Sequence, residues 1–181
     1  LWDTYRARMP LYNLINRSRS KDMTASMLAH YDQSVHHILP IWSHMGNENW
    51  CMIGYHSVSV LSDAMTKGIE MDREKALEAM VSSSRLPYYG GLEDYLKYGY
   101  VTLESSSTAA SNTYEYAYDD WAIAHAAQLM GRNDLYEEYM GRSEYYRNSF
   151  DSSLGFARPR FRDGSFKADF DVLSTANQGF I

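Results

Sequence analysis

Three acidic residues share one predicted helix, and their spacing is compatible with proton transfer. Glu115 and Asp119 are four residues apart in TYEYAYDDWAIAHAAQLM, and Asp120 follows directly. Residues four apart lie on one helix face, where two like charges repel by about 0.2–0.5 kcal/mol. A carboxyl pair of this kind is a candidate general acid and base. The structural alternative is that arginines or backbone N–H groups neutralise carboxylates on an otherwise buried helix.

A second group of candidates lies in GNENWCMIGYH, which runs from Gly46 to His56 and mixes large apolar with hydrogen-bonding residues. We predict that Glu48 and His56 bind substrate, with Asn47 and Tyr55 facing the same opening. The alternative for Glu48 is capping of the helix that follows. The alternative for His56 is a buried histidine whose ring nitrogens are satisfied within the protein.

Other reactive motifs are missing from the sequence. It contains no His-Glu-x-x-His zinc pair, Walker A loop, dinucleotide-binding glycine motif or Gly-x-Ser-x-Gly elbow. The one cysteine, Cys51, excludes an internal disulfide and a multi-thiolate metal site, and its apolar surroundings predict a buried, unreactive thiol.

A net charge of −6 argues against nucleic acid as a partner. No apolar run is long enough to predict a membrane span.

The helices that must position these residues alternate between two kinds. Residues 24–37, 73–84 and 135–150 have one apolar stripe and one charged face, which predicts half-exposed helices. Residues 51–67 and 113–130 are apolar or small nearly all round, which predicts buried helices. We expect Asp72 to cap one helix, Asn112 with Glu115 to form a capping box, and Gly131 to end the helix before it.

This alternation predicts an all-α fold that forms part of an (α/α)6 toroid, with one helix of each hairpin inside and one outside. A straight helical solenoid is the alternative, but it requires a repeat of about 34–47 residues, which the sequence lacks. The one β-hairpin we expect lies in the connection 156–170, where Asp163-Gly164 forms its turn. We also expect short extended pieces near 98–103.

Polar, aromatic segments precede the buried helices, and in a ring of antiparallel hairpins all inner helices begin at the same end. These segments are WDTYR (2–6), GNENW (46–50), SSSTAASNTYE (105–115) and STANQGFI (174–181). They are therefore predicted to meet at one mouth. Helix N-termini there offer free N–H groups to an oxygen-rich ligand, and an aromatic share of 14% fits a polar, ring-shaped ligand as well as an aromatic core.

The order of several long motifs resembles glycoside hydrolase family 92, the calcium-dependent exo-acting α-mannosidases. The motifs are LWDTYRARMPLYNLI, GNENWCMIGYHSVSVLSDAMTKGI, EYAYDDWAIA and NSFDSSLGFARPRFRDGSF. The resemblance covers essentially all 181 residues. It implies that residues 1–181 are an internal part of the (α/α)6 catalytic domain, with an N-terminal β-sandwich domain and the rest of the catalytic domain outside this sequence.

The resemblance also assigns roles. It implies that the catalytic acid, a glutamate, comes just after Ile181, and that the general base and main calcium ligands lie further on, so this sequence holds no catalytic or metal-binding residue. Inverting glycosidases need two carboxyl groups about 6.5–9.5 Å apart, and on this interpretation both lie elsewhere. Asp3, in WDTYR, matches an aspartate expected to bind hydroxyls of the terminal mannose; the alternative is capping of the next helix. A secreted, periplasmic or cell-surface location is expected from the family.

Three functions remain open at this point. The first is part of an inverting exo-α-mannosidase that removes terminal α-linked mannose from N-glycans or mannans. The second is an (α/α) glycosidase or lyase of other specificity that uses Glu115, Asp119 or Asp120. The third is a non-catalytic helical carbohydrate-binding module. With the family resemblance, structural pairing becomes the favoured role of the three acidic residues.

Overall fold

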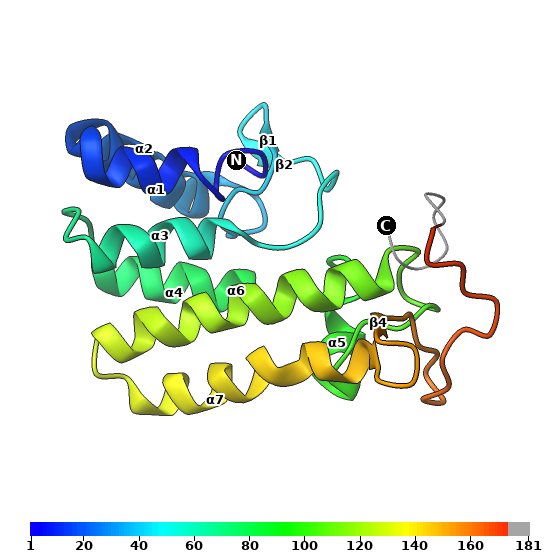
Figure 1. Ribbon diagram of the computed structural model, residues 1–181. Helices are drawn as coiled ribbons and strands as arrows, with labels where there is room; N and C mark the ends of the chain where they lie inside the picture. The colour runs from blue at the N-terminus through cyan, green and yellow to red at the C-terminus, as the bar shows by residue number, and fades with distance from the viewer. Residues whose placement is uncertain (174–181) are drawn as a thin grey trace.

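A computed structural model describes residues 1–173, and within them the fold is helical with two short hairpins (Figure 1). The strands pair as β1 with β2 and β3 with β4. Within the described part, no helix is long and apolar enough to cross a membrane. The elements are α1 (Arg8–Ile15), α2 (Arg17–Gln33), β1 (Ser43–His44), β2 (Asn47–Glu48), α3 (Ser57–Thr66), α4 (Arg73–Ser83), α5 (Leu92–Tyr98), α6 (Ala109–Leu129), α7 (Asn133–Ser143), the 3-10 helix η1 (Glu144–Ser149), β3 (Phe150–Asp151) and β4 (Phe156–Ala157).

Burial separates inner from outer helices as the sequence predicts. Eight of the ten residues of α3 and thirteen of the twenty-one of α6 are buried. Only four of the seventeen residues of α2 and three of the eleven of α7 are buried. Figure 1 shows α6 running through the middle of the molecule, with α3 and α4 on one side and α7 on the other. The buried helices therefore alternate along the chain with half-exposed ones.

Several predicted helix boundaries are wrong by up to seven residues. The helix predicted from Cys51 begins at Ser57, because Gly54 adopts φ +79° and breaks the helical path. The predicted capping box at Asn112 is also wrong, since α6 begins at Ala109 and Asn112 lies buried within it. Asp72 is confirmed as a cap: its side chain accepts a hydrogen bond from the N–H of Lys75.

The other boundary errors concern the first helix and the last turns. The helix predicted over 24–37 is α2, which begins and ends earlier and is followed by extended and turn residues. The helix predicted over 135–150 changes from α7 to the 3-10 helix η1 after Ser143. Gly131 follows the end of α6 with φ +67°, as a glycine after a helix commonly does.

The small β elements lie in the connections. The predicted Asp163-Gly164 turn is present, and an antiparallel bridge joins Arg160 to Phe166 on its two sides. A parallel bridge between Thr102 and Arg160 accounts for the extended piece expected near 98–103. The hairpins β1–β2 and β3–β4 were not predicted from the sequence, because each strand is only two residues long.

Tyrosines account for much of the core. Tyr55, Tyr95, Tyr116 and Tyr139 are fully buried among aliphatic side chains from α3, α4 and α6. The rings of Tyr55 and Tyr116 stack with their centroids 5.2 Å apart, and Tyr95 meets Tyr116 edge to face at 5.4 Å. Several tyrosines thus build the interior, where their hydroxyl groups are available for buried polar contacts.

Candidate functional site

Two of the four segments predicted to form a mouth, 2–6 and 105–115, contact each other directly, and His56, which follows the third segment 46–50, contacts both. The turn Trp2–Arg6, the segment 46–56 and the first half of α6 are joined through Tyr5, His56 and Glu115. Tyr5 donates its hydroxyl to Glu115 Oε2 at 3.2 Å, and its ring stacks on His56 with centroids 4.0 Å apart. Arg6 Nη2 lies 3.5 Å from Glu115 Oε1. The fourth segment, 174–181, lies outside the described residues.

His56 is enclosed by two carboxylates and has no exposed surface. Its Nδ1 lies 2.8 Å from Asp119 Oδ1, and its Nε2 lies 3.1 Å from Glu115 Oε2, the second contact being an ion pair without hydrogen-bond alignment. Burial alone lowers the pKa of His56, but the charges and hydrogen bonds of Asp119 and Glu115 raise it to about 9. His56 is therefore an imidazolium at neutral pH.

Asp119 also fixes the backbone ahead of α3. Its Oδ2 accepts the N–H of Tyr55 at 2.6 Å, while its Oδ1 faces His56. Burial raises the pKa of Asp119, and the charge of His56 opposes that rise. The two oxygens of this carboxylate are thus used within the protein, which ties α6 to the start of α3.

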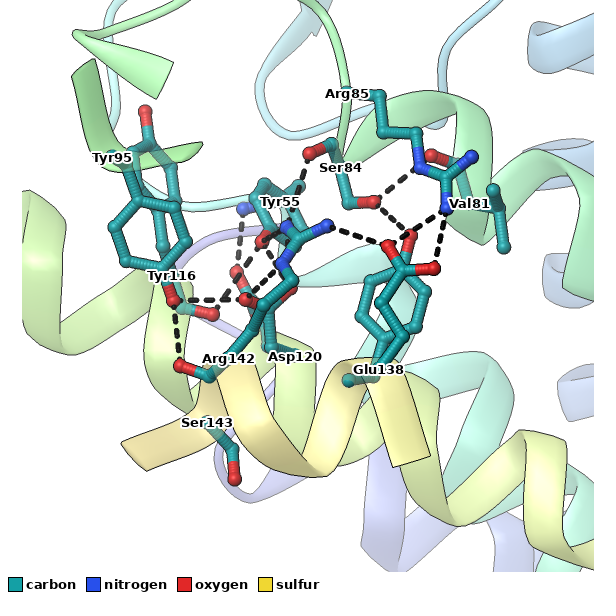
Figure 2. Close-up of polar contacts among 12 residues, drawn as sticks. Tyr55, Val81, Ser84, Arg85, Tyr95, Tyr116, Asp120, Glu138, Arg142 and Ser143 are labelled. Carbon is teal, nitrogen blue, oxygen red and sulfur yellow. Dashed lines mark hydrogen bonds and ion pairs between the residues drawn. The ribbon is translucent and has the colours of Figure 1, made fainter. Parts of the chain in front are cut away.

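Asp120 forms a second buried ion pair, with Arg142 of α7 (Figure 2). The guanidinium donates through Nη2 to Oδ1 and through Nε to Oδ2, each at 2.9 Å. Tyr55 and Tyr95 donate their hydroxyls to the same carboxylate at 2.7 and 2.8 Å. Burial raises the pKa of Asp120 to about 6, and the charge of Arg142 opposes the rise. These partners are the ones that the structural alternative for the acidic cluster requires.

The structure places the predicted substrate-binding residues in three different settings. Glu48 is buried, and its carboxylate accepts four backbone N–H groups, those of Ile41, Trp42, Asn49 and Trp50, so it shapes the loop. Capping by Glu48 is not seen, because α3 has no side-chain cap. His56 is the N-cap residue of α3 and is held as described above. A sugar-binding role for Glu48 and His56 stays a prediction, and a ligand would have to compete with these internal partners.

Asp3 differs from the other two because it is exposed. Within residues 1–173, no group donates a hydrogen bond to its carboxylate. The alternative that Asp3 caps the next helix is wrong, since α1 begins at Arg8 after Ala7 and has no side-chain cap. A sugar-binding role for Asp3 stays a prediction, and its exposed carboxylate has no internal partner within residues 1–173 that a ligand would have to displace.

A pocket of about 570 Å³ is lined by residues of two of the segments predicted to form the mouth, Trp50 of 46–50 and Ser106–Thr108 with Asn112 of 105–115. One prediction is corrected there. Cys51 is exposed rather than buried, because its segment is a loop and not a helix. His36, which lies just beyond α2, contacts Tyr88 and Trp50. The walls of the pocket come from His36, Trp50–Ile53, Tyr88–Gly90, Ser106–Thr108, Asn112 and Tyr116.

The acidic cluster does not suit a calcium ion. Calcium takes six to eight oxygen ligands with free lone pairs, whereas the oxygens of Asp119 and Asp120 face imidazolium, guanidinium, hydroxyl and N–H donors. Across residues 1–173, no group of three or more His, Cys, Asp or Glu side chains is placed to hold a metal ion.

The comparison with protein families decides the identity of this helical domain. The protein-family model described as the glycosyl hydrolase family 92 catalytic domain matches residues 1–181 of this chain. The chain belongs to glycoside hydrolase family 92. The comparison with curated proteins returned no match.

Solved structures of this family superpose closely on the chain. The GH92 α-mannosidase BT3965 from Bacteroides thetaiotaomicron matches at 43% identity and TM-score 0.93 over 97% of this chain and 24% of that one. Its complex with mannoimidazole matches at 44% identity and TM-score 0.91, over 94% and 23%. The GH92 inverting mannosidase BT2199 from B. thetaiotaomicron VPI-5482 matches at 37% identity and TM-score 0.88, over 94% and 24%. The all-α toroid fold is thus confirmed, and the chain spans about a quarter of these GH92 structures.

Proposed function

We propose that this GH92 chain is part of an inverting exo-acting α-mannosidase that removes terminal α-linked mannose from N-glycans or mannans. The observation that carries the proposal is the exposed carboxylate of Asp3, two residues before Tyr5, whose side chain contacts Glu115 and His56. A free carboxylate accepts hydrogen bonds from two vicinal sugar hydroxyls. The similarity to an inverting GH92 mannosidase at 37% identity supports the reaction type.

The contacts of this chain's acidic residues indicate which part of the enzyme binds the sugar and which part supplies the catalytic groups. The carboxylates of Asp119 and Asp120 are engaged by internal partners, so this chain supplies the wall that holds the sugar and not the acid and base. We place the catalytic acid just after Ile181 and the general base further on, in parts of the protein outside this sequence. The N-terminal β-sandwich domain is likewise proposed to precede this chain.

A calcium ion is proposed for the whole enzyme, with its ligands outside this chain, because the acidic cluster described above does not fit it. The family as a whole is generally calcium-dependent. When bound, the ion would act as a Lewis acid that polarises sugar hydroxyls. A secreted, periplasmic or cell-surface location is part of the same proposal.

The test follows the hydrolysis of methyl α-mannoside by NMR with the full-length protein and with residues 1–181 alone. The full-length protein should release β-mannose first, which then mutarotates, and residues 1–181 should release none. Initial release of α-mannose would contradict inversion, and no release by the full-length protein would contradict mannosidase activity. Hydrolysis by residues 1–181 alone would favour the alternative in which Glu115, Asp119 or Asp120 is catalytic.

A further inference from the structure

The turn that carries Asp3 is joined to the rest of the molecule through the two residues that follow it most closely in the fold, Tyr5 and Arg6. The N–H groups of Thr4 and Tyr5 donate to the carbonyl of Leu1 at 2.8 and 3.1 Å, so the turn is closed on itself. Tyr5 is only 6% exposed, whereas Asp3 is exposed. The position of the Asp3 carboxylate therefore depends on how Tyr5 and Arg6 are anchored.

A single carboxylate of α6, that of Glu115, anchors both of these residues. The Tyr5 hydroxyl donates to Glu115 Oε2 at 3.2 Å, and Arg6 Nη2 lies 3.5 Å from Glu115 Oε1. The Arg6 guanidinium also lies 4.8 and 4.3 Å from the ring centroids of Trp2 and Tyr5, which holds its charge against the turn. Two contacts fix the orientation of the turn as well as its distance from α6.

Glu115 is held in turn by a buried pair behind it. His56 Nε2 lies 3.1 Å from Glu115 Oε2, and His56 Nδ1 lies 2.8 Å from Asp119 Oδ1. The side chains of His56 and Asp119 have no exposed surface, whereas that of Glu115 is 22% exposed. Asp119, His56 and Glu115 thus form a chain of alternating charges that runs from the interior to the Asp3 turn.

These contacts argue against a direct chemical role for Glu115. Each of its two oxygens already faces a group of the protein, so a sugar hydroxyl would have to displace one of them. Burial acts to raise the pKa of Glu115, but the contact and charge of His56 and the charge of Arg6 lower it below its usual value. The general acid of a glycosidase has a raised pKa instead.

We infer that Glu115 is a positioning residue that holds the Asp3 carboxylate in place for the terminal mannose, acting through Tyr5 and Arg6. The inference rests on the proposed mannosidase function and on the sugar contact predicted for Asp3. Reacting groups tolerate little displacement, since a misplacement of about 1 Å can lower a rate by about a hundredfold. Glu115 thereby sets the geometry of a sugar contact that it does not itself make.

The test is a double-mutant cycle in the full-length enzyme, with Glu115→Gln and Asp3→Asn made singly and together. The assay is fluoride release from α-mannosyl fluoride, whose one sugar is the terminal mannose. Glu115→Gln should lower kcat/KM by about tenfold and raise KM, whereas a smaller folded fraction would lower the apparent kcat and leave KM unchanged. In the Asp3→Asn background the same substitution should cost less than about twofold, because the contact through which Glu115 acts is already lost.

Hydrogen–deuterium exchange of peptide 1–9 in the full-length enzyme follows the turn itself. Exchange should be faster in Glu115→Gln, because the turn has lost its charged anchor, and unchanged in Asp3→Asn. Asp63→Asn is the matched control. Asp63 accepts a hydrogen bond from Asn13 at 2.7 Å and so ties the far end of α1 to α3. This variant should leave both kcat/KM and the exchange of peptide 1–9 unchanged.

The possible failures are distinguishable. If Glu115→Gln lowers kcat/KM equally with and without the Asp3 carboxylate, Glu115 acts independently of Asp3 and the inference is overturned. Normal kcat/KM for Glu115→Gln would overturn it as well. Normal kcat/KM for Asp3→Asn would refute the sugar contact of Asp3 and the positioning role together. Failure of the unmodified enzyme to hydrolyse α-mannosyl fluoride would instead refute the proposed function.

Discussion

The charged state of His56 makes a quantitative prediction about stability against pH. Its pKa is raised from 6.5 to about 9 in the folded protein, so between these values the folded state holds a proton that the unfolded state has lost. Stability should fall by roughly 1.4 kcal/mol per pH unit across this range, or roughly 3 kcal/mol in total. The contribution of His56 is fully present below pH 6.5 and absent above pH 9.

The assay is urea unfolding, followed by tryptophan fluorescence from pH 6 to 10, for the unmodified protein and for His56→Asn. Asparagine keeps a donor for Asp119 but does not titrate. The stability difference between the two proteins should be larger at pH 6 than near pH 10 by roughly 3 kcal/mol, and the packing loss from the missing ring remains at both pH values. His44, exposed on β1, provides the control His44→Asn, which should leave the pH dependence unchanged. A constant difference between the unmodified protein and His56→Asn from pH 6 to 10 would refute a protonated His56.

Three further perturbations follow from the packing. Arg142→Met should destabilise the fold by about 3–5 kcal/mol in urea unfolding, because it leaves the buried Asp120 carboxylate without its cation; a loss below 1 kcal/mol would contradict this. Gly54→Ala should lower the melting temperature more than Gly131→Ala does. Both positions have positive φ, but of the two only Gly54 would place the new methyl group against a neighbour, the His56 ring. Equal melting temperatures of the two variants would contradict this. Residues 1–181 in isolation should bind a hydrophobic dye, because large apolar side chains such as those of α1 and α6 are exposed; a sharp, reversible melt of a monodisperse monomer without dye binding would contradict this.

The sequence was informative where burial alone decides the structure. The apolar circumference of α6 and the charged face of α4 predict their inner and outer places, because burial follows the hydrophobic pattern along a helix. The convergence of the segments holding Tyr5, His56 and Glu115 followed from the geometry of antiparallel hairpins, without any knowledge of side-chain contacts.

The errors have a common cause in local polar geometry. The segment after Glu48 is apolar enough to predict a helix, but four backbone N–H groups bound by that carboxylate hold it in a loop. Cys51 is exposed for this reason, and Trp50 reaches the pocket. Such contacts depend on three-dimensional placement, so hydrophobic periodicity carries no signal for them.

The most direct test of the central claim is Asp3→Asn in the full-length enzyme, with kinetics and melting measured on the same preparation. If the exposed carboxylate binds hydroxyls of the terminal mannose, kcat/KM should fall by on the order of ten- to a hundredfold, since a charge-assisted hydrogen bond contributes roughly 1.5–3 kcal/mol. The loss should persist at saturating calcium, and the melting temperature should stay within about 1 °C. Asp22→Asn, at an exposed aspartate of α2, should change neither quantity. Near-normal kcat/KM with a lowered melting temperature for Asp3→Asn would contradict the account.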